Sequence, residues 1–262
     1  LLEVRDVKKR FGGFVAVNGV SFDVEEGMVF GVAGPNGAGK SVLFATISGF
    51  YRPDSGDVRF AGRSIAGERP HRICRLGLTR TFQTPSLFSS MSIADNIRVG
   101  AEFGNETGRD PVPELLELLE LEDVADKRAS NLDLFTTKKV VLGAALATAP
   151  KLILLDEPMA GFSHAEVDAY QGLVQRIRKE RGVTVIIIEH LLDVLIGLSD
   201  RMLILNYGQV LFEGDPEEVR HHPEVVEVYL GGATQQDGAD GRAAGSSGDR
   251  AQGSSGGEGE SA

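Results

Sequence analysis

The chain has 262 residues, enough for one large domain or two small ones, and its 42% hydrophobic and 25% charged residues are typical of a soluble globular protein. The net charge of −11 argues against a nucleic-acid binder, because phosphate backbones attract basic surfaces. The single cysteine, Cys74, cannot form an internal disulfide. We expect no signal peptide at residues 1–10, and the apolar run at 183–198 is too short and too polar at its centre to cross a membrane. Any membrane role must therefore come through a partner.

The first sixty residues predict strands and tight turns. Residues 20–24 alternate apolar and polar side chains, as in a strand with one buried face. Residues 28–33, "MVFGVA", form a continuous apolar run typical of a buried parallel strand, and a helix-like stretch follows the glycines after it. Residues 53–62 predict a turn that leads into a short strand.

The remainder alternates helices with strands. Residues 111–127 carry leucines at helical spacing, and we expect mostly helix as far as Pro150. Two further buried strands are predicted at "KLILLDEP" and "VTVIIIEH", separated by a helix at 163–182 that opens with a Ser-x-x-Glu capping box. A hairpin at 201–214 and a helix capped by Asp215 follow. This alternation indicates a parallel α/β core.

The most specific motif is "GPNGAGKS" at residues 34–41, which fits the phosphate-binding loop G-x-x-x-x-G-K-[ST]. Its glycines let backbone N–H groups surround phosphate oxygens at a helix N-terminus, where the helix dipole favours negative charge. Lys40 is expected to reach the β and γ phosphates, and the Ser41 hydroxyl to bind Mg²⁺. The nucleotide-binding residues expected here are Gly34, Pro35, Asn36, Gly37, Ala38, Gly39, Lys40, Ser41 and Val42.

Polar side chains end the other two buried strands. Asp156, in "LILLDEP", is expected to hold Mg²⁺, and Glu157 to polarise an attacking water as general base. His190, in "IIIEH", is expected to lie close to a γ-phosphate. Gln83, in "RTFQTPSLF", is by itself no more than a turn residue.

These motifs in this order resemble the ATP-binding subunits of ABC transporters, over about residues 1–232. Within that superfamily, "RTFQTPSLF", "LATAPKLILLDEPMAGF" and "SDRMLILNYGQVLFEGDPEEVRHHPEVVEVYLGG" are similar to importer subunits for branched-chain amino acids and related amides such as urea. The resemblance implies an α/β fold, a P-loop NTPase (RecA-like) parallel-sheet core with an antiparallel β subdomain and a helical subdomain at about 89–149. We expect residues 233–262, rich in Gly and Ser, to form a disordered acidic tail.

The resemblance also implies roles for single residues. Phe11 matches the aromatic that stacks on adenine, with core packing as the alternative. Gln83 matches the loop glutamine that contacts Mg²⁺ and the attacking water and relays to the membrane subunit. Ser163 lies where the family has the polar residue of the dimer-crossing loop, although capping its helix is a sufficient explanation. Residues 84–100 are expected to border the groove for the coupling helix of the membrane partner.

One family motif has been replaced. In the family a Leu-Ser-Gly-Gly-Gln-like signature precedes the helix that leads to the second carboxylate strand, and its amides hold the γ-phosphate of ATP on the opposite subunit. Here residues 132–136 are Leu-Asp-Leu-Phe-Thr. Leu134 and Phe135 add bulk where glycine is needed, and Asp133 adds a charge that repels phosphate by roughly 4 kcal/mol at about 4 Å. The alternative is that Asp133 or Thr136 caps a helix that begins near Thr137, and such a cap is worth only about 1 kcal/mol.

The chain is therefore expected to keep its own nucleotide site and to offer a poor signature to its neighbour. We expect an ATP-hydrolysing importer motor, paired with a second ATP-binding subunit in a heterodimer in which one site works. Transmembrane permease subunits would hold it at the cytoplasmic face of the cell membrane, and a periplasmic or extracellular solute-binding protein would act with the complex indirectly. Val42 and Leu191 replace a hydroxyl residue and an aspartate that are common in the family. Neither change removes a group with an assigned role.

Other functions remain open. A regulatory ABC subunit that holds ATP with little turnover is favoured by the replaced signature and opposed by Glu157 and His190. A soluble ABC protein that acts on DNA or ribosomes is opposed by the single cassette, the lack of a coiled-coil insertion and the acidic charge. A GTPase is disfavoured because the sequence contains no Asn-Lys-x-Asp motif.

Overall fold

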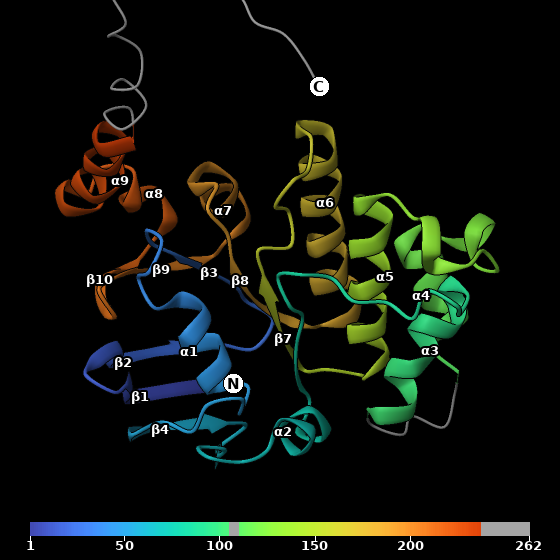
Figure 1. Cartoon of the computed structure of the whole chain (residues 1–262), viewed down its shortest axis with the longest axis horizontal. Coiled ribbons are helices and arrows are strands. Elements are labelled where there is room, and N and C mark those ends of the chain that lie inside the picture. The colour runs from blue at the N-terminus through green and yellow to red at the C-terminus, as the bar shows by residue number, and fades with distance from the viewer. Residues whose placement is uncertain (105–109, 237–262) are drawn as a thin grey trace, which may run out of the picture.

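A computed structural model describes residues 1–104 and 110–236 of the chain. A smaller sheet lies over one face of a larger sheet, and two long helices, α5 (Leu134–Ala147) and α6 (His164–Arg181), pack on the opposite face (Figure 1). No helix among the described residues combines the length and the apolar character that a membrane span requires. The expected disordered tail falls largely at residues 237–262, which lie outside the described part of the chain.

The larger sheet has six strands, and five of them are parallel, as the buried apolar runs predict. In spatial order they are β10 (Gln209–Gly214), β9 (Arg201–Asn206), β3 (Val29–Ala33), β8 (Thr184–Ile188), β7 (Leu152–Asp156) and β6 (Leu78–Arg80). Only β10 is antiparallel, because it returns from β9 in the predicted hairpin. Every residue of β3, β7 and β8 is buried, which is why these strands are apolar without alternation.

The second sheet is antiparallel and comes from the N-terminal region. Its strands, in spatial order, are β2 (Phe14–Val24), β1 (Leu2–Phe11), β4 (Ser55–Phe60) and β5 (Arg63–Ser64). It covers α1 (Lys40–Ile47), the helix that follows β3, and the short α2 (Pro70–Leu76) leads from it back to β6. The expected antiparallel β subdomain is therefore present.

A group of helices lies at the far end of the larger sheet (Figure 1). It consists of α3 (Ile93–Phe103), α4 (Val112–Leu119), two 3-10 turns (Glu122–Val124 and Ala129–Asn131) and α5 (Leu134–Ala147). α5 packs against both α3 and α4 and delivers the chain to β7. These helices fall within residues 89–149, where a helical subdomain is expected.

The remaining helices follow the strands in order. They are α6 (His164–Arg181), α7 (Leu192–Leu198), α8 (Pro216–Val219) and α9 (Pro223–Gln236). Ser163 caps α6 in the predicted capping box, and Asp215 caps α8 through the Glu217 amide. α9 continues to Gln236, past the expected domain boundary at 232.

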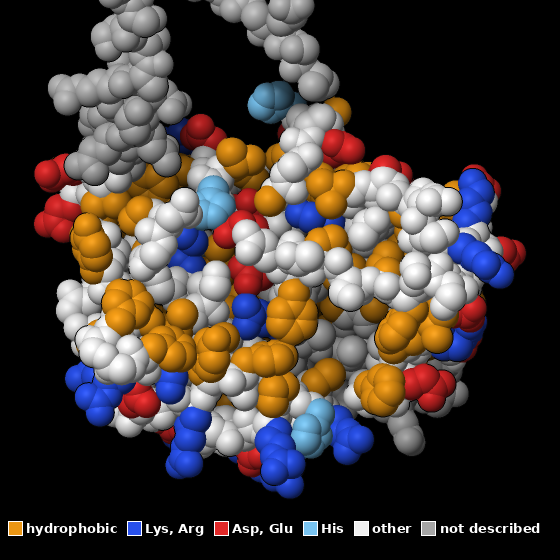
Figure 2. Space-filling model, viewed as in Figure 1, with side chains coloured by type: hydrophobic (Ala, Val, Ile, Leu, Met, Phe, Trp, Pro, Cys, Tyr) orange, Lys and Arg blue, Asp and Glu red, His pale blue; other side chains and the backbone are white. Residues whose placement is uncertain are grey.

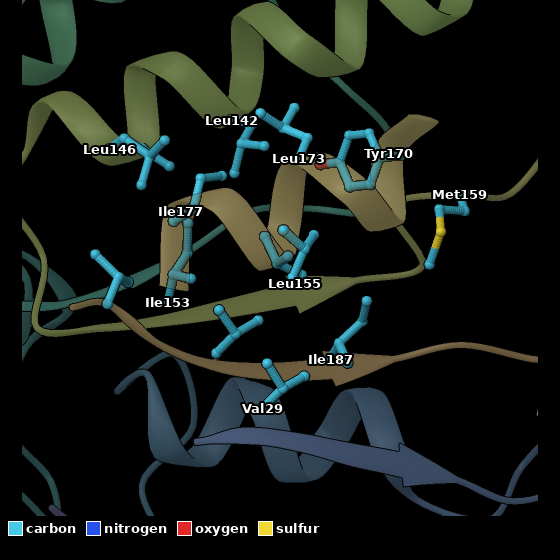
Figure 3. Close-up of a cluster of buried hydrophobic side chains, with 14 of the residues drawn as sticks. Val29, Leu142, Leu146, Ile153, Leu155, Met159, Tyr170, Leu173, Ile177 and Ile187 are labelled. Atoms are coloured by element: carbon cyan, nitrogen blue, oxygen red, sulfur yellow. The ribbon is translucent and has the colours of Figure 1, made fainter. Parts of the chain in front are cut away.

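Two hydrophobic cores lie on opposite faces of the larger sheet, because successive strand residues point to opposite sides. Ile153 and Leu155 face α5 and α6, where Leu142, Tyr170 and Ile177 join them (Figure 3). On the other face, side chains of β3, β7 and β8 pack with α1 and the antiparallel sheet. This packing fixes the carboxyl ends of β3, β7 and β8 beside one another.

Candidate functional site

The loop between β3 and α1 adopts a backbone that its glycines alone allow. Gly34, Gly37 and Gly39 all have positive φ, and a Cβ on Gly39 would collide with the carbonyl oxygen of Ala16. Gly39 caps α1 without any side-chain hydrogen bond, and no acidic residue occupies the first turn. The first amides of α1 are therefore left for an anion, as the motif predicts.

Lys40 lies inside this loop. Its Nζ donates to the carbonyl oxygens of Gly34 at 2.7 Å and Pro35 at 3.0 Å. Burial lowers the pKa of Lys40, although the nearby carboxylates of Glu157 and Asp156 raise it. The ammonium is thus held beside the acidic side chains of the neighbouring strands.

A cleft of about 210 Å³ opens over the loop. It is lined by Phe14, Ala16, Asn36, Gly37, Ala38, Gly39, Lys40, Ser41, Val42, Glu157 and His190. Seven of these are expected nucleotide-binding residues, and two are expected catalytic residues. Gly34 and Pro35 lie behind the cleft, where their carbonyl groups bind Lys40.

Asp156 ends β7 and is 96% buried. Its Oδ2 accepts a hydrogen bond from Arg80 Nη2 at 2.8 Å, whereas its Oδ1 is buried without a partner among the described residues. A buried carboxylate oxygen without a donor fits a metal ligand, because Mg²⁺ prefers such oxygens together with hydroxyl groups and phosphate. Within residues 1–104 and 110–236 no cluster of three acidic, His or Cys side chains could hold a metal alone.

Glu157 is the centre of the hydrogen-bonded group. His190 Nε2 lies 2.7 Å from Glu157 Oε1, and Gln83 Nε2 donates to Glu157 Oε2. The backbone of Glu157 has φ +49°, a left-handed conformation that is costly for a residue with a Cβ and concentrates at functional sites. The structure therefore brings together the three residues expected to be catalytic.

Two buried charged residues that the sequence analysis did not single out support this turn. Lys138 of α5 donates to the backbone carbonyl oxygens of Glu157 at 3.1 Å and Ala160 at 2.9 Å. Glu189 accepts a hydrogen bond from the Met159 amide, and burial raises its pKa. The chain position of Glu189 beside His190 was the one sequence signal for it. Nothing in sequence spacing links Lys138 to this turn.

The cleft has Phe14 in its wall rather than Phe11. Phe11 is 43% exposed, packs edge-on against Tyr51 and lies under the Lys9 ammonium. Phe14 is 63% exposed and pairs with Phe11 across the turn between β1 and β2. The adenine contact of Phe11 stays a prediction, and Phe14 is the aromatic residue that lines the cleft.

The segment at 132–136, predicted to replace the family signature, leads into α5, and the helix starts at Leu134 rather than near Thr137 as expected. The reason is that Asp133 caps it: Oδ1 accepts from the Thr136 amide and Oδ2 from the Thr136 hydroxyl, both at 2.7 Å. The Thr136 amide, more than the hydroxyl, lowers the pKa of Asp133, so the side chain is a carboxylate at neutral pH. Of the two possible caps, Asp133 is the one formed.

The two bulky residues of this segment point in different directions. Phe135 turns inward, with its ring 5.1 Å from that of Phe162, which in turn packs against Tyr170. Leu134 is 43% exposed and lies against Gly161. Only Leu134 and Asp133 therefore add bulk or charge to the surface. The Ser163 side chain, as part of the capping box, is occupied within its own helix.

Comparison with known proteins gives a consistent result. A family described as "ABC transporter" matches residues 17–160, and one described as "Branched-chain amino acid ATP-binding cassette transporter" matches residues 209–234. The chain is 36% identical to the high-affinity branched-chain amino acid transport ATP-binding protein BraF of Pseudomonas aeruginosa, over 89% of this chain and 98% of that protein. It is 35% identical to the probable branched-chain amino acid transport ATP-binding protein LivG of Archaeoglobus fulgidus, over 88% and 95%.

Solved structures agree on the fold. The ADP conformation of MJ1267, an ATP-binding cassette of an ABC transporter, has a TM-score of 0.81 and 33% identity over 88% of this chain and 98% of that one. A nucleotide-free ATP-binding cassette from an ABC transporter has a TM-score of 0.79 and 32% identity, over 87% and 98%. The predicted cassette fold is confirmed.

Proposed function

The chain belongs to the ATP-binding subunits of ABC transporters, which couple ATP hydrolysis to transport, and from that premise we propose that it drives an importer for branched-chain amino acids. The proposal is supported by the segment from β10 to α9, which matches a branched-chain amino acid cassette family, and by the names of the relatives. Transmembrane permeases are the partners of such a subunit. We place this one at the cytoplasmic face of the membrane, served by an external solute-binding protein.

The observation that carries the hydrolytic role is the arrangement around Glu157. Its carboxylate is bonded by His190 and Gln83 at the mouth of a cleft that ends in the Lys40 loop. Such a carboxylate can orient and deprotonate a water beside a γ-phosphate. Ser41, Asp156 Oδ1 and Gln83 would hold Mg²⁺, which would neutralise phosphate charge.

The function is tested by steady-state ATP hydrolysis of the purified chain beside a Lys40→Ala control. Lysine-dependent turnover is expected at a low rate in the isolated chain and at a higher rate with its permease and partner subunit. Uptake of labelled leucine into vesicles that contain the complete transporter tests the solute. ATP turnover without leucine uptake would support the ATPase activity and contradict a branched-chain amino acid as the transported solute.

We propose further that the signature at 132–136 makes the transporter asymmetric. In α5 the Asp133 carboxylate occupies the helix N-terminus, which is where an intact signature would receive a phosphate of the opposite subunit. Because Asp133 is exposed, screening reduces the repulsion well below the roughly 4 kcal/mol estimated at an effective dielectric of about 20. A second ATP-binding subunit with an intact signature then supplies the one competent site.

The asymmetry is tested by replacing residues 133–136 with Ser-Gly-Gly-Gln in the reconstituted complex. ATP turnover should rise, because serine keeps the cap while the charge and the Leu134 side chain are removed. Since the change also removes Phe135 from its contact with Phe162, Phe135 should be retained in a second variant that changes only 133 and 134. If ATP turnover stays unchanged in both variants, residues 133–136 do not limit ATP hydrolysis by the complex.

A regulatory subunit that holds ATP with little turnover is the second candidate. The Asp133 cap supports it, and the Glu157 group argues against it. Binding of ATP with no lysine-dependent turnover, alone and in the complete complex, would favour this alternative.

A further inference from the structure

Arg80, at the end of β6, is a buried cation that neither the phosphate loop nor the water-activating group explains. Its side chain is 9% exposed, and Nη2 donates to Asp156 Oδ2 at 2.8 Å. Asp156 is the carboxylate at the metal position, and its other oxygen has no partner among the described residues. Arg80 is thus the counter-ion of Asp156 when no metal is bound.

Aromatic rings hold the Arg80 guanidinium on its other sides. Its Cζ lies 5.3 Å from the ring centroid of Phe82 and 5.9 Å from those of Phe44 and Phe50. Phe44 is fully buried, whereas Phe50 and Phe82 are 50% and 52% exposed and contact each other edge-on. These two rings, here called the aromatic pair, connect the surface of the molecule to Arg80.

Apolar side chains also gather on the face shown in Figure 2, over the region of α1 and the antiparallel sheet, with Lys and Arg along its lower edge. Phe50 directly follows the α1 region, and Phe82 follows β6 just before Gln83. A contact on the aromatic pair therefore acts on a cation that is one hydrogen bond away from the metal-binding carboxylate.

We propose that Arg80 is a positioning residue that competes with Mg²⁺ for the charge of Asp156, and that the aromatic pair sets the strength of this competition. Occupation of the metal position would place a divalent cation next to a guanidinium in a buried site, where like charges repel strongly. Any displacement of Phe50 or Phe82 that withdraws Arg80 from Asp156 then strengthens metal binding. A permease that contacts the aromatic pair would cause such a displacement, and this step alone rests on the proposed function.

The charge balance predicts two effects of opposite sign when Arg80 is removed. Without metal, Asp156 becomes a buried carboxylate with no cation in contact, so the protein loses stability. With Mg²⁺ bound, the carboxylate is compensated again and the repulsion from the guanidinium is gone. Nucleotide binding should therefore depend more strongly on Mg²⁺. A purely structural arginine would lower stability and leave this dependence unchanged.

The experiment measures the dissociation constant of ADP for the purified full-length chain in the presence of Mg²⁺ and in the presence of EDTA. In Arg80→Gln the ratio of the EDTA value to the Mg²⁺ value should rise by about tenfold over the unsubstituted chain, with a lower melting temperature in EDTA. Arg80→Lys keeps the charge and should give a smaller rise. An unchanged or smaller ratio in Arg80→Gln would overturn the proposal.

Exposed-ring variants test the aromatic pair and remain informative if the Arg80 variants fail to fold. Phe82→Ala should raise the same ratio severalfold, because the guanidinium loses one of its supporting rings. Phe103→Ala is the matched control, since Phe103 is 68% exposed and has no aromatic or cationic ring contact within the described structure. Equal ratios in the two variants would show that the aromatic pair does not affect the competition between Arg80 and Mg²⁺. ADP binding needs no transport, so failure of the proposed function leaves these measurements intact.

Discussion

The loop at 34–41 and the segment at 132–136 both open a helix, but they leave the helix N-terminus in opposite states. Gly39 caps α1 with backbone alone, and the amides behind it remain free for phosphate. Asp133 caps α5 with a carboxylate that already binds the Thr136 amide. One helix is an open anion receptor, and the other carries its own anion. The dipole of α1 is therefore left to a bound phosphate, whereas that of α5 already stabilises its own carboxylate.

The comparison also shows that the two regions are joined. Lys138, one turn into α5, bonds the backbone of Glu157 and Ala160. The first turns of α5 are thus hydrogen-bonded to the catalytic turn within a single subunit. Inward packing of Phe135 on Phe162 adds a second link. The segment at 132–136 is therefore hydrogen-bonded and packed as part of the fold.

The largest effect is expected at the open site. Glu157→Gln keeps the size of the side chain and its contacts with Gln83 and His190 but removes the base. ATP hydrolysis should fall by at least about 100-fold, while ATP binding remains near that of the unsubstituted chain. Parallel measurements of turnover and of ATP affinity separate these effects. Full turnover in this variant would mean that Glu157 is not the base.

The next effect concerns the link between the regions. Lys138→Met leaves the Ala160 carbonyl oxygen without a donor and the Glu157 carbonyl oxygen with only the Ala160 amide at 3.3 Å. It should lower the free energy of unfolding by about 2 kcal/mol, as measured by urea denaturation. Lys139→Met is the control, since Lys139 is also buried in α5 but makes one longer bond, 3.3 Å to the Glu120 carbonyl oxygen. If the two variants lose equal stability, the contact of Lys138 with the catalytic turn has no special role.

Sequence reasoning succeeded where a strong local pattern and one physical requirement coincide. The runs at 28–33, 152–156 and 184–188 are apolar because both faces of the sheet are covered. Their sequence alone therefore identified them as buried parallel strands. The glycine loop is constrained by backbone sterics, and its residues line the cleft. Helix ends were predictable at Ser163 and Asp215 because their side chains bond their own neighbours.

The rest depended on contacts between distant segments. Arg80 and Asp156 are 76 positions apart, and Lys138 reaches a turn 19 residues further along the chain. No periodicity or spacing encodes such pairs. The start of α5 was misjudged because a capping aspartate and a broken signature look alike in sequence, and only the hydrogen bonds to Thr136 distinguish the cap.

A smaller effect separates the two bulky residues of the replaced segment. Phe135→Ala removes a half-buried ring that packs on Phe162 and should cost about 1–2 kcal/mol of unfolding free energy. Leu134→Ala should cost less than about 0.5 kcal/mol, because that side chain is 43% exposed. Thermal unfolding of both variants provides the measurement. A larger loss for Leu134 than for Phe135 would reverse the orientation assigned to them.

One substitution tests whether the Asp133 carboxylate keeps phosphate away from the N-terminus of α5. Asp133→Ser keeps a good cap while removing the charge, so stability should change by less than about 0.5 kcal/mol. ATP turnover of the complex should rise by roughly threefold to tenfold, since an exposed charge is partly screened. Asp133→Ala removes both charge and cap and serves as the comparison. A rise in Asp133→Ala with no rise in Asp133→Ser would show that the cap, and not the charge, limits turnover.

The smallest effect is a pH dependence at the junction of the two regions, where Glu189 faces Lys138 and Glu157. Burial raises the pKa of Glu189 above its ordinary value, and the charges of Lys138 and Glu157 act on it in opposite directions. A raised pKa means that its contribution to stability is present below about pH 4.5 and is lost as pH rises through the folded-state value. Glu189→Gln keeps the acceptor for the Met159 amide, so the variant should gain stability relative to the unsubstituted chain as pH rises above 4.5. Melting temperatures from pH 5 to pH 8 measure this difference, and a constant difference across that range would show that Glu189 does not titrate there.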